Sequence, residues 1–132
     1  MLQENVETVT RAIDAINHRD IDGYLACCTE DVQLVTPVAD VGGAYDGPGG
    51  IRRFFTDIAD AAPDFKIVIE RLEAVGPDRV LGFMCVTGTG RASGIPIENP
   101  TGNVYDFAQD RIQRIRIFFD RDQALEAAGL SE

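Results

Sequence analysis

The spacing of hydrophobic residues predicts three helices in the first half of the chain. Over residues 3–18, apolar side chains recur every three or four positions, which is typical of a helix with one buried face. Asp20 can cap a short second helix, whose apolar side carries Ile21, Tyr24, Leu25 and Cys28. A third helix runs from about Ile51 to Pro63, where it ends because proline cannot continue the hydrogen-bond ladder.

Strand patterns fill most of the remaining sequence. One strand, from Val32 to Pro37, precedes a Gly- and Asp-rich loop over 38–50, and four strands then follow at 65–75, 79–89, roughly 100–108 and 111–119. The last strand alternates in character almost residue by residue. The glycines and prolines of 88–100 predict an irregular link between two strands, and 122–128 predicts a final short helix ended by Gly129.

This order of elements predicts an α+β fold. A curved antiparallel or mixed sheet, with about three N-terminal helices on one side, would form a cone that encloses a cavity. The length of 132 residues predicts one domain, over residues 1–132, with a core that needs no covalent cross-links. A cavity in a small α+β scaffold favours binding or transformation of a small molecule.

Charge and cysteine content narrow the classes of partner. The chain has 12 basic and 22 acidic residues and a net charge of −10, which disfavours nucleic acid and anionic membranes as partners. Three cysteines and one histidine provide neither a disulfide framework nor zinc-ligand spacing. With no signal-peptide pattern and no apolar span at the start, these features predict a cytoplasmic protein that has no metal or cofactor.

Four short segments resemble the superfamily named for nuclear transport factor two, which includes SnoaL-like polyketide cyclases, ketosteroid isomerases and limonene-epoxide hydrolases. They are Asp20-Ile21-Asp22, Glu30-Asp31-Val32, the stretch Tyr45-Asp46-Gly47 with Ile51 and Phe54-Phe55, and Asp110-Arg111-Ile112. The resemblance covers nearly the whole chain. These segments are mainly architectural, so the resemblance is informative about fold and much less so about activity.

The resemblance also implies which face of each strand points into the cone. Inward positions would be Val32, Leu34 and Thr36 on the first strand, Thr101, Asn103, Tyr105 and Phe107 on the next to last, and Gln113, Ile115, Ile117 and Phe119 on the last. Arg114, Arg116 and Phe118 would then point outward. A slip of one residue in register would bring the arginines inside and favour an anionic ligand.

The catalytic groups of the related enzymes are replaced at the matching positions. Ketosteroid isomerases use an aspartate base, a tyrosine and a protonated aspartic acid where this chain has Thr36, Ala12 and Asn103. SnoaL-like cyclases keep a carboxylate at the position matched by Asn103. The Asp-Arg-Asp set of limonene-epoxide hydrolases has no counterpart among the inward residues. An asparagine can hydrogen-bond an oxygen, but it cannot shuttle a proton.

The remaining polar groups of the interior are the candidate site. Asn103 and Tyr105 are the candidates for polarising a substrate oxygen, and Asp40, in the Gly-rich loop, is the candidate proton carrier. Ligand contacts are expected from Tyr24, Leu34, Thr36, Phe55, Met84, Thr101, Gln113, Ile115, Ile117 and Phe119.

Three functions follow as alternatives. The first is a cofactor-free enzyme for cyclisation, isomerisation, dehydration or epoxide opening of an apolar, ring-containing metabolite. The second is a non-catalytic protein that binds such a ligand, because the usual carboxylates are missing. The third is an interaction module that forms a homodimer through an apolar outer patch of Phe118, Val104 and Phe83 or Cys85.

Overall fold

The computed structural model describes residues 2–36 and 44–129. Within these ranges the chain alternates between helical and extended segments, as the hydrophobic pattern predicts. The elements in chain order are α1 (Leu2–Asn17), α2 (Ile21–Ala26), β1 (Cys28–Val35), β2 (Tyr45–Asp46), α3 (Gly47–Ala61), β3 (Lys66–Ala74), β4 (Arg79–Thr89), β5 (Pro96–Ala108), β6 (Arg111–Phe118) and α4 (Arg121–Ala128).

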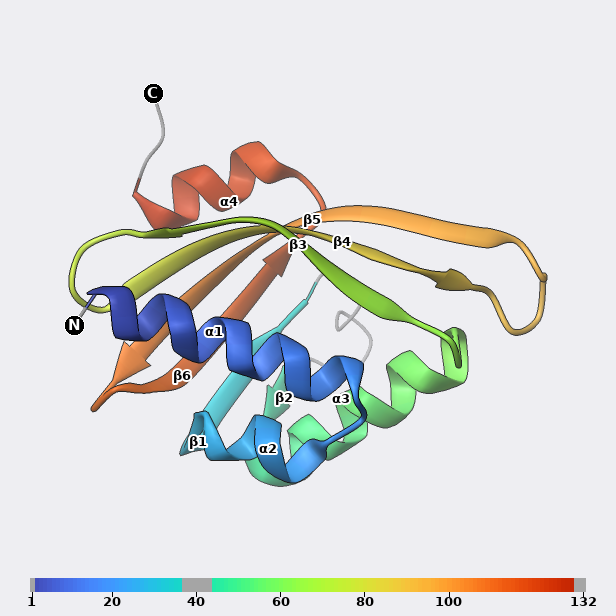
Figure 1. Cartoon of the computed structure of the whole chain (residues 1–132), viewed down its shortest axis with the longest axis horizontal. Helices are drawn as coiled ribbons and strands as arrows, with labels where there is room; N and C mark the ends of the chain where they lie inside the picture. Colours follow the sequence, from blue (N-terminus) through green and yellow to red (C-terminus); the bar gives the residue numbers. More distant parts are fainter. Residues whose placement is uncertain (1, 37–43, 130–132) are drawn as a thin grey trace.

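The strands form one mixed sheet in the order β2-β1-β6-β5-β4-β3. The β1–β6 pair is parallel and the other neighbouring pairs are antiparallel. Helices α1, α2 and α3 lie on one side of this curved sheet, and α4 lies on the other (Figure 1). The predicted α+β fold with a curved mixed sheet is therefore confirmed.

Irregular pairing accompanies the curvature of the sheet. The register shifts between Ile69 and Arg71 on β3, and again between Asp106 and Phe107 on β5. An extra residue in one strand bends that strand and increases its local twist. The shift on β5 also changes which β6 side chains face the helices, as described below.

Several element boundaries differ from the sequence prediction. Strand β1 begins at Cys28 rather than at Val32, so Cys28 belongs to this strand and not to the second helix, and α3 begins at Gly47 rather than near Ile51. The region expected to be loop contains β2, because Tyr45 and Asp46 pair with Leu34 and Gln33 of β1. Strand β5 begins at Pro96 rather than near residue 100, and this first part pairs with β4 alone. A proline is tolerated there because that side of β5 has no neighbouring strand to receive an N–H group.

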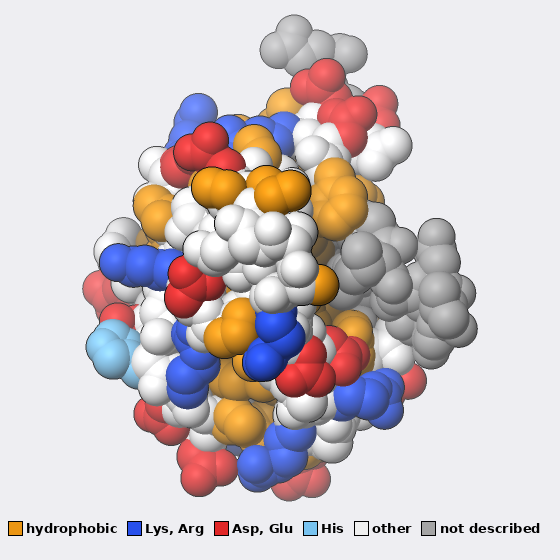
Figure 2. All heavy atoms as spheres, turned by 90° about the vertical axis from the view of Figure 1, so that its right-hand side faces the viewer, with side chains coloured by type: hydrophobic (Ala, Val, Ile, Leu, Met, Phe, Trp, Pro, Cys, Tyr) orange, Lys and Arg blue, Asp and Glu red, His pale blue; other side chains and the backbone are white. Residues whose placement is uncertain are grey.

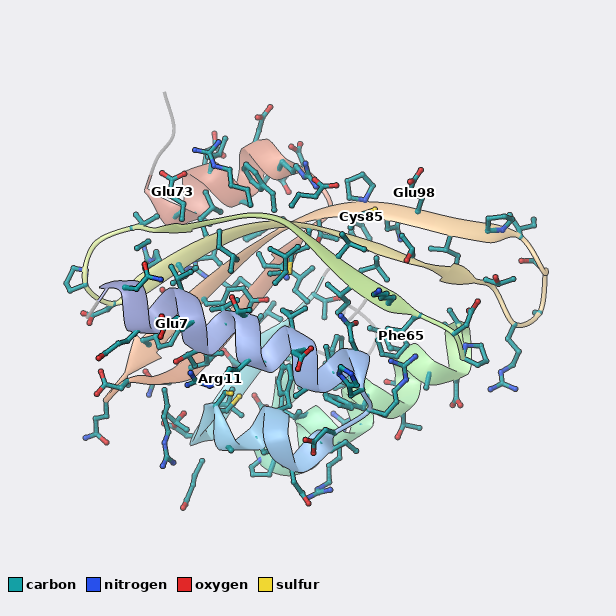
Figure 3. All side chains as sticks on the ribbon, in the orientation of Figure 1. Glu7, Arg11, Phe65, Glu73, Cys85 and Glu98 are labelled. Atoms are coloured by element: carbon teal, nitrogen blue, oxygen red, sulfur yellow. The ribbon has the colours of Figure 1, made fainter. Side chains whose placement is uncertain are left out.

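The main core lies between the sheet and helices α1 to α3, and many side chains occupy this space (Figure 3). A smaller apolar cluster lies on the outer face, where Leu81 and Val104 pack against Ala124 and Ala128 of α4. This second cluster corrects one expectation. Val104 is buried, and Phe118 and Phe83 pack against the same cluster, so the predicted outer apolar patch is largely covered by α4.

Candidate functional site

The inner face of the sheet carries a buried polar group at its centre. Asn103 and Tyr105, on β5, point toward the helices and lie beside Met84 of β4. The Asn103 Nδ2 amide donates to the Tyr105 hydroxyl at 3.1 Å and to the Met84 sulfur at 3.4 Å. The Tyr105 hydroxyl in turn donates to the same sulfur at 3.8 Å. The two residues predicted to polarise a ligand therefore contact one another.

The other end of the Asn103 amide has no partner within the described residues. Its Oδ1 atom is buried and accepts no hydrogen bond, and the residue as a whole is only 6% exposed. In this orientation the NH2 group faces Met84 and the Tyr105 hydroxyl. With the amide turned by half a turn, the Tyr105 hydroxyl would donate to Oδ1 instead, because a phenol O–H both donates and accepts hydrogen bonds.

Two buried tyrosines complete this interior. Burial raises the pKa of Tyr105 from its ordinary value of 10.0 to about 12, while the hydrogen bond from Asn103 opposes the rise. Burial also raises the pKa of Tyr24, whose ring makes an edge contact with Phe55 at 5.2 Å between centroids. Both hydroxyls therefore stay protonated near neutral pH, and they act as hydrogen-bond donors rather than as bases.

The buried state of Tyr105 predicts a loss of stability in alkali. Below about pH 10 the tyrosine is protonated in both the folded and the unfolded chain, so it contributes no pH dependence. Between about pH 10 and 12 the unfolded chain loses this proton while the folded chain keeps it, which costs about 1.4 kcal/mol per pH unit. Urea unfolding from pH 8 to 11.5 should show this decline, and Tyr105→Phe should have a shallower slope. Equal slopes for the two proteins would contradict the assignment.

A cavity of about 240 Å³ lies beside this polar group, between α3 and the sheet. Its wall is mainly apolar and is made by Thr36, Phe54, Ile58, Ala61, Ala62, Phe65, Val86, Ile97, Asn99, Thr101, Ile117 and Phe119. Asn103 lies immediately behind this wall, because it pairs across the sheet with Ile117 and follows Thr101 by two positions. The cavity and the unpaired amide therefore belong to one region of the interior.

Apart from Gln113, which is described below, the predicted ligand residues separate into two groups. Thr36, Thr101, Ile117 and Phe119 line the cavity. Tyr24, Leu34, Phe55, Met84 and Ile115 are buried in the core behind it. Asp40, the predicted proton carrier, lies outside the described residues. The threonines and Asn99 of the wall can form hydrogen bonds, but these groups do not remove a carbon-bound proton near neutral pH.

Several cavity residues were missed at the sequence level. Phe54 and Ile58 belong to the predicted apolar face of the third helix, but nothing in that periodicity separates a cavity wall from a solid core. Ile97 and Asn99 were missed because the strand was expected to begin near residue 100. Phe65 lies where the chain passes from α3 to β3 (Figure 3), and the Arg19 guanidinium stacks on its ring at 3.7 Å.

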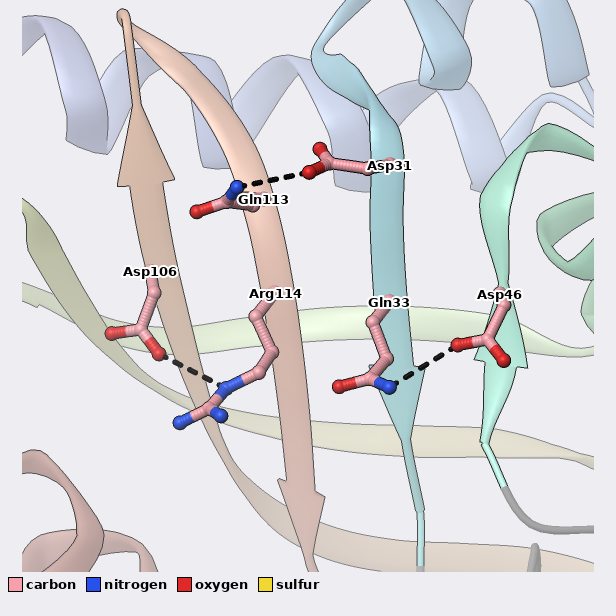
Figure 4. Close-up of a pocket in the computed structure, with 6 residues that line it drawn as sticks. All are labelled: Asp31, Gln33, Asp46, Asp106, Gln113 and Arg114. Carbon is pink, nitrogen blue, oxygen red and sulfur yellow. Dashed lines mark hydrogen bonds and ion pairs between the residues drawn. The ribbon is translucent and has the colours of Figure 1, made fainter.

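The predicted inward orientation of Gln113 is wrong. Asp106 pairs with Arg114 and Phe107 pairs with Ile112, so Gln113 is the extra residue on β6 at this shift. Its exposed side chain donates from Nε2 to Asp31 at 3.2 Å on the face away from α1 (Figure 4). Because the bulge adds one residue, Ile112 takes the inward place, while Ile115 and Ile117 keep theirs.

The outer face around Gln113 is polar. It forms a hollow of about 400 Å³ lined by Asp31, Gln33, Asp46, Asp106, Gln113 and Arg114 (Figure 4). Asp106 is the centre of an ion-pair cluster, in which its carboxylate meets the guanidinium groups of Arg79 at 2.7 Å, Arg116 at 3.1 Å and Arg114 at 3.4 Å. Burial lowers the pKa of Arg116, and the adjacent Asp106 carboxylate counteracts this change.

Other surfaces show mixed chemistry. Viewed from the end where β4 turns into β5, hydrophobic side chains are interspersed with acidic and basic ones (Figure 2).

Within residues 2–36 and 44–129, no three His, Cys, Asp or Glu side chains gather as metal ligands would. In the same ranges no helix has the length and apolar character required to cross a membrane. The predicted homodimer and cytoplasmic location stay predictions.

Comparison with known proteins identifies the fold. Bal32a, from a soil-derived mobile gene cassette, is 23% identical and has a TM-score of 0.79, with 88% of each chain covered. TerC, co-crystallised with polyporic acid, is 22% identical over 96% of this chain and 98% of that one, with a TM-score of 0.78. RV0760c from Mycobacterium tuberculosis, in complex with estradiol-17beta-hemisuccinate, is 17% identical over 90% of this chain and 95% of that one, with a TM-score of 0.75.

A search of curated proteins found no match to the sequence. The SnoaL-like domain profile, in contrast, matches residues 9–115, which is most of the chain. Together with the curved sheet and the helices that line its inner face, this match confirms the resemblance seen in the sequence. Its fold is similar to that of solved nuclear transport factor two-like proteins, and the chain belongs to the SnoaL-like domain family.

Proposed function

We propose that this protein binds a small, apolar, ring-containing molecule in the cavity between α3 and the sheet. The observation that carries the proposal is the cavity itself, whose wall combines apolar side chains with the hydroxyls of Thr36 and Thr101 and the amide of Asn99. Sites for small ligands typically have such a wall, with a few polar groups that fix orientation.

The volume sets the size of the ligand. At about 240 Å³ the cavity exceeds the roughly 150 Å³ hole that admits benzene. It is smaller than the roughly 300–1,000 Å³ typical of sites for drug-sized molecules. A molecule of one or two rings therefore fits best. Polyporic acid and the estradiol derivative, bound by proteins of the same fold, support a ring-containing ligand in general terms.

Filling the cavity tests this function. Ile58→Trp places an indole into the wall and should weaken binding of a two-ring probe such as 2-naphthol at least ten-fold, because the ligand would lose its space. Thr56→Trp adds the same indole to an exposed position of the same helix and should leave binding unchanged. Calorimetry measures the affinity, and the melting-temperature rise with ligand provides a second readout. Equal affinity in the parent and Ile58→Trp would place the ligand elsewhere.

A second candidate function is cofactor-free catalysis of cyclisation, isomerisation, dehydration or epoxide opening. Membership of the SnoaL-like family supports it, as do the hydroxyls of Tyr24 and Tyr105, which burial keeps protonated in the interior. In this mechanism the Tyr105 hydroxyl donates its hydrogen bond to a substrate oxygen instead of to the Met84 sulfur. Asp40 remains the proposed proton carrier. Recovery of a bound metabolite in altered form, by mass spectrometry, would distinguish enzyme from binder.

A further inference from the structure

We propose that Arg19 sets the size limit of the ligand cavity by fixing one residue of its wall, Phe65. Phe65 and Ala62 line the cavity, whereas Arg19 does not. Arg19 is therefore a positioning residue that acts through Phe65. The proposal rests on the cavity function proposed above and adds a determinant of ligand size to it.

Arg19 holds the segment of residues 62–65, which connects α3 to β3 and carries part of the cavity wall. Because these residues lie outside both elements, their backbone carbonyl groups need other partners. The Arg19 Nη2 group donates to the carbonyl oxygens of Pro63 at 3.1 Å and Phe65 at 2.8 Å. The guanidinium also stacks on the Phe65 ring, 3.7 Å from its centroid. One side chain thus fixes both the backbone and the ring of Phe65.

The backbone at Arg19 indicates that the side chain has a role of its own. The turn after α1 has the hydrogen bonds of a Schellman motif, from Arg19 N–H to Ile16 O at 3.1 Å and from Asp20 N–H to Ala15 O at 2.8 Å. Arg19 occupies the left-handed position of this motif, with a φ of 60°. Glycine is usual there because it has no Cβ atom to clash. An arginine in a conformation that favours glycine points to a function of its side chain.

A second anchor keeps the backbone of this segment in place when Arg19 is replaced. The Thr89 N–H group of β4 donates to Asp64 Oδ1 at 2.8 Å. The segment also lies close against β4, since a Cβ atom at Gly88 would come within 3.1 Å of the Phe65 Cα atom. Loss of Arg19 should therefore release the Phe65 ring rather than the whole segment. A ring that is free to swing outward would enlarge the cavity at this end.

The test compares the affinities of 2-naphthol and 9-phenanthrol, which has one more ring, by fluorescence titration. The parent should bind 2-naphthol at least ten-fold more tightly, because the third ring overfills the cavity. Arg19→Met keeps an unbranched side chain but removes the charge and the donors, and should reduce the preference to three-fold or less. Arg52→Met is the matched control at an exposed arginine, 3.4 Å from Asp22, and should keep the preference.

A double-mutant cycle tests whether Arg19 acts through Phe65. Phe65→Leu alone should reduce the preference, and adding Arg19→Met to it should change the ratio of the two affinities by less than two-fold. General loosening of the fold would weaken both ligands together and leave their ratio unchanged, so the ratio separates positioning from stability. Arg19→Lys keeps the charge but lacks the planar guanidinium, and should give an intermediate preference. It replaces Arg19→Met in the comparison if that variant fails to fold.

Three results would overturn the inference and leave the cavity function standing. The first is an unchanged preference in Arg19→Met. The second is an equal effect of Arg19→Met with and without Phe65→Leu, since Arg19 would then act without Phe65. The third is equal binding of 2-naphthol and 9-phenanthrol by the parent, which would show that the wall sets no such limit. Binding of neither compound would overturn the proposed function together with the inference.

Discussion

Asp106→Asn is expected to lower the free energy of unfolding by about 3 kcal/mol, because it removes the anion from a partly buried cluster of cations. The guanidinium groups of Arg79, Arg114 and Arg116 all lie within 3.4 Å of the Asp106 carboxylate. Asparagine keeps a hydrogen-bond acceptor of similar shape but cancels the charge. Three cations would then repel one another, and the least exposed of them, Arg116, would lose its counter-ion.

Urea unfolding at pH 7 measures this effect. The matched control is Glu73→Gln, which removes the carboxylate from the more exposed pair of Arg71 and Glu73 at 2.8 Å. Exposed pairs contribute at most about 1 kcal/mol, so this variant should unfold close to the parent midpoint. High salt should reduce the Asp106 effect only in part, because partly buried charges are screened less than exposed ones. A loss below about 1 kcal/mol for Asp106→Asn would contradict the cluster's role in stability.

Gly102→Ala is expected to destabilise the protein by about 2–3 kcal/mol through overpacking between β5 and α4. A Cβ atom built on Gly102 comes within 2.5 Å of the Ala124 Cβ atom and 3.5 Å of the Arg121 Cα atom. Real Cβ atoms do not approach so closely, so α4 would have to move away from the sheet. That movement would loosen the outer apolar cluster of Leu81, Val104, Ala124 and Ala128.

A double-mutant cycle separates this clash from other effects of the substitution. Ala124→Gly removes the opposing methyl group, so Gly102→Ala should cost at least about 1 kcal/mol less in that background. Gly49→Ala is the matched control in α3, where an added Cβ meets nothing within 4 Å. It should stabilise the fold by about 0.5–1 kcal/mol, because alanine restricts the unfolded chain. Additive costs at 102 and 124 would show that the two side chains do not compete for space.

The sequence pattern predicts the orientation of some residues of the candidate site and misses that of others. The inward positions that the family resemblance implies are found at Thr101, Asn103, Tyr105 and Ile117, because the register of β5 is regular from Gly102 to Asp106. Gln113 does not, because one extra residue on β6 shifts it to the outer face. No local sequence signal marks this bulge, which depends on how β6 fits against its two neighbouring strands.

The sequence by itself determined the succession of helices and strands, since hydrophobic spacing and the Pro63 and Gly129 stops act over a few residues. It also determined the mixed chemistry of the interior, with amides and hydroxyls at the positions of the family's carboxylates. Tertiary structure decided the rest. It joined β2 to β1, placed α4 over the outer face and turned the Asn103 donors toward Tyr105 and Met84. These outcomes depend on contacts between residues distant in sequence, or on the orientation of a single amide, and residue patterns carry neither.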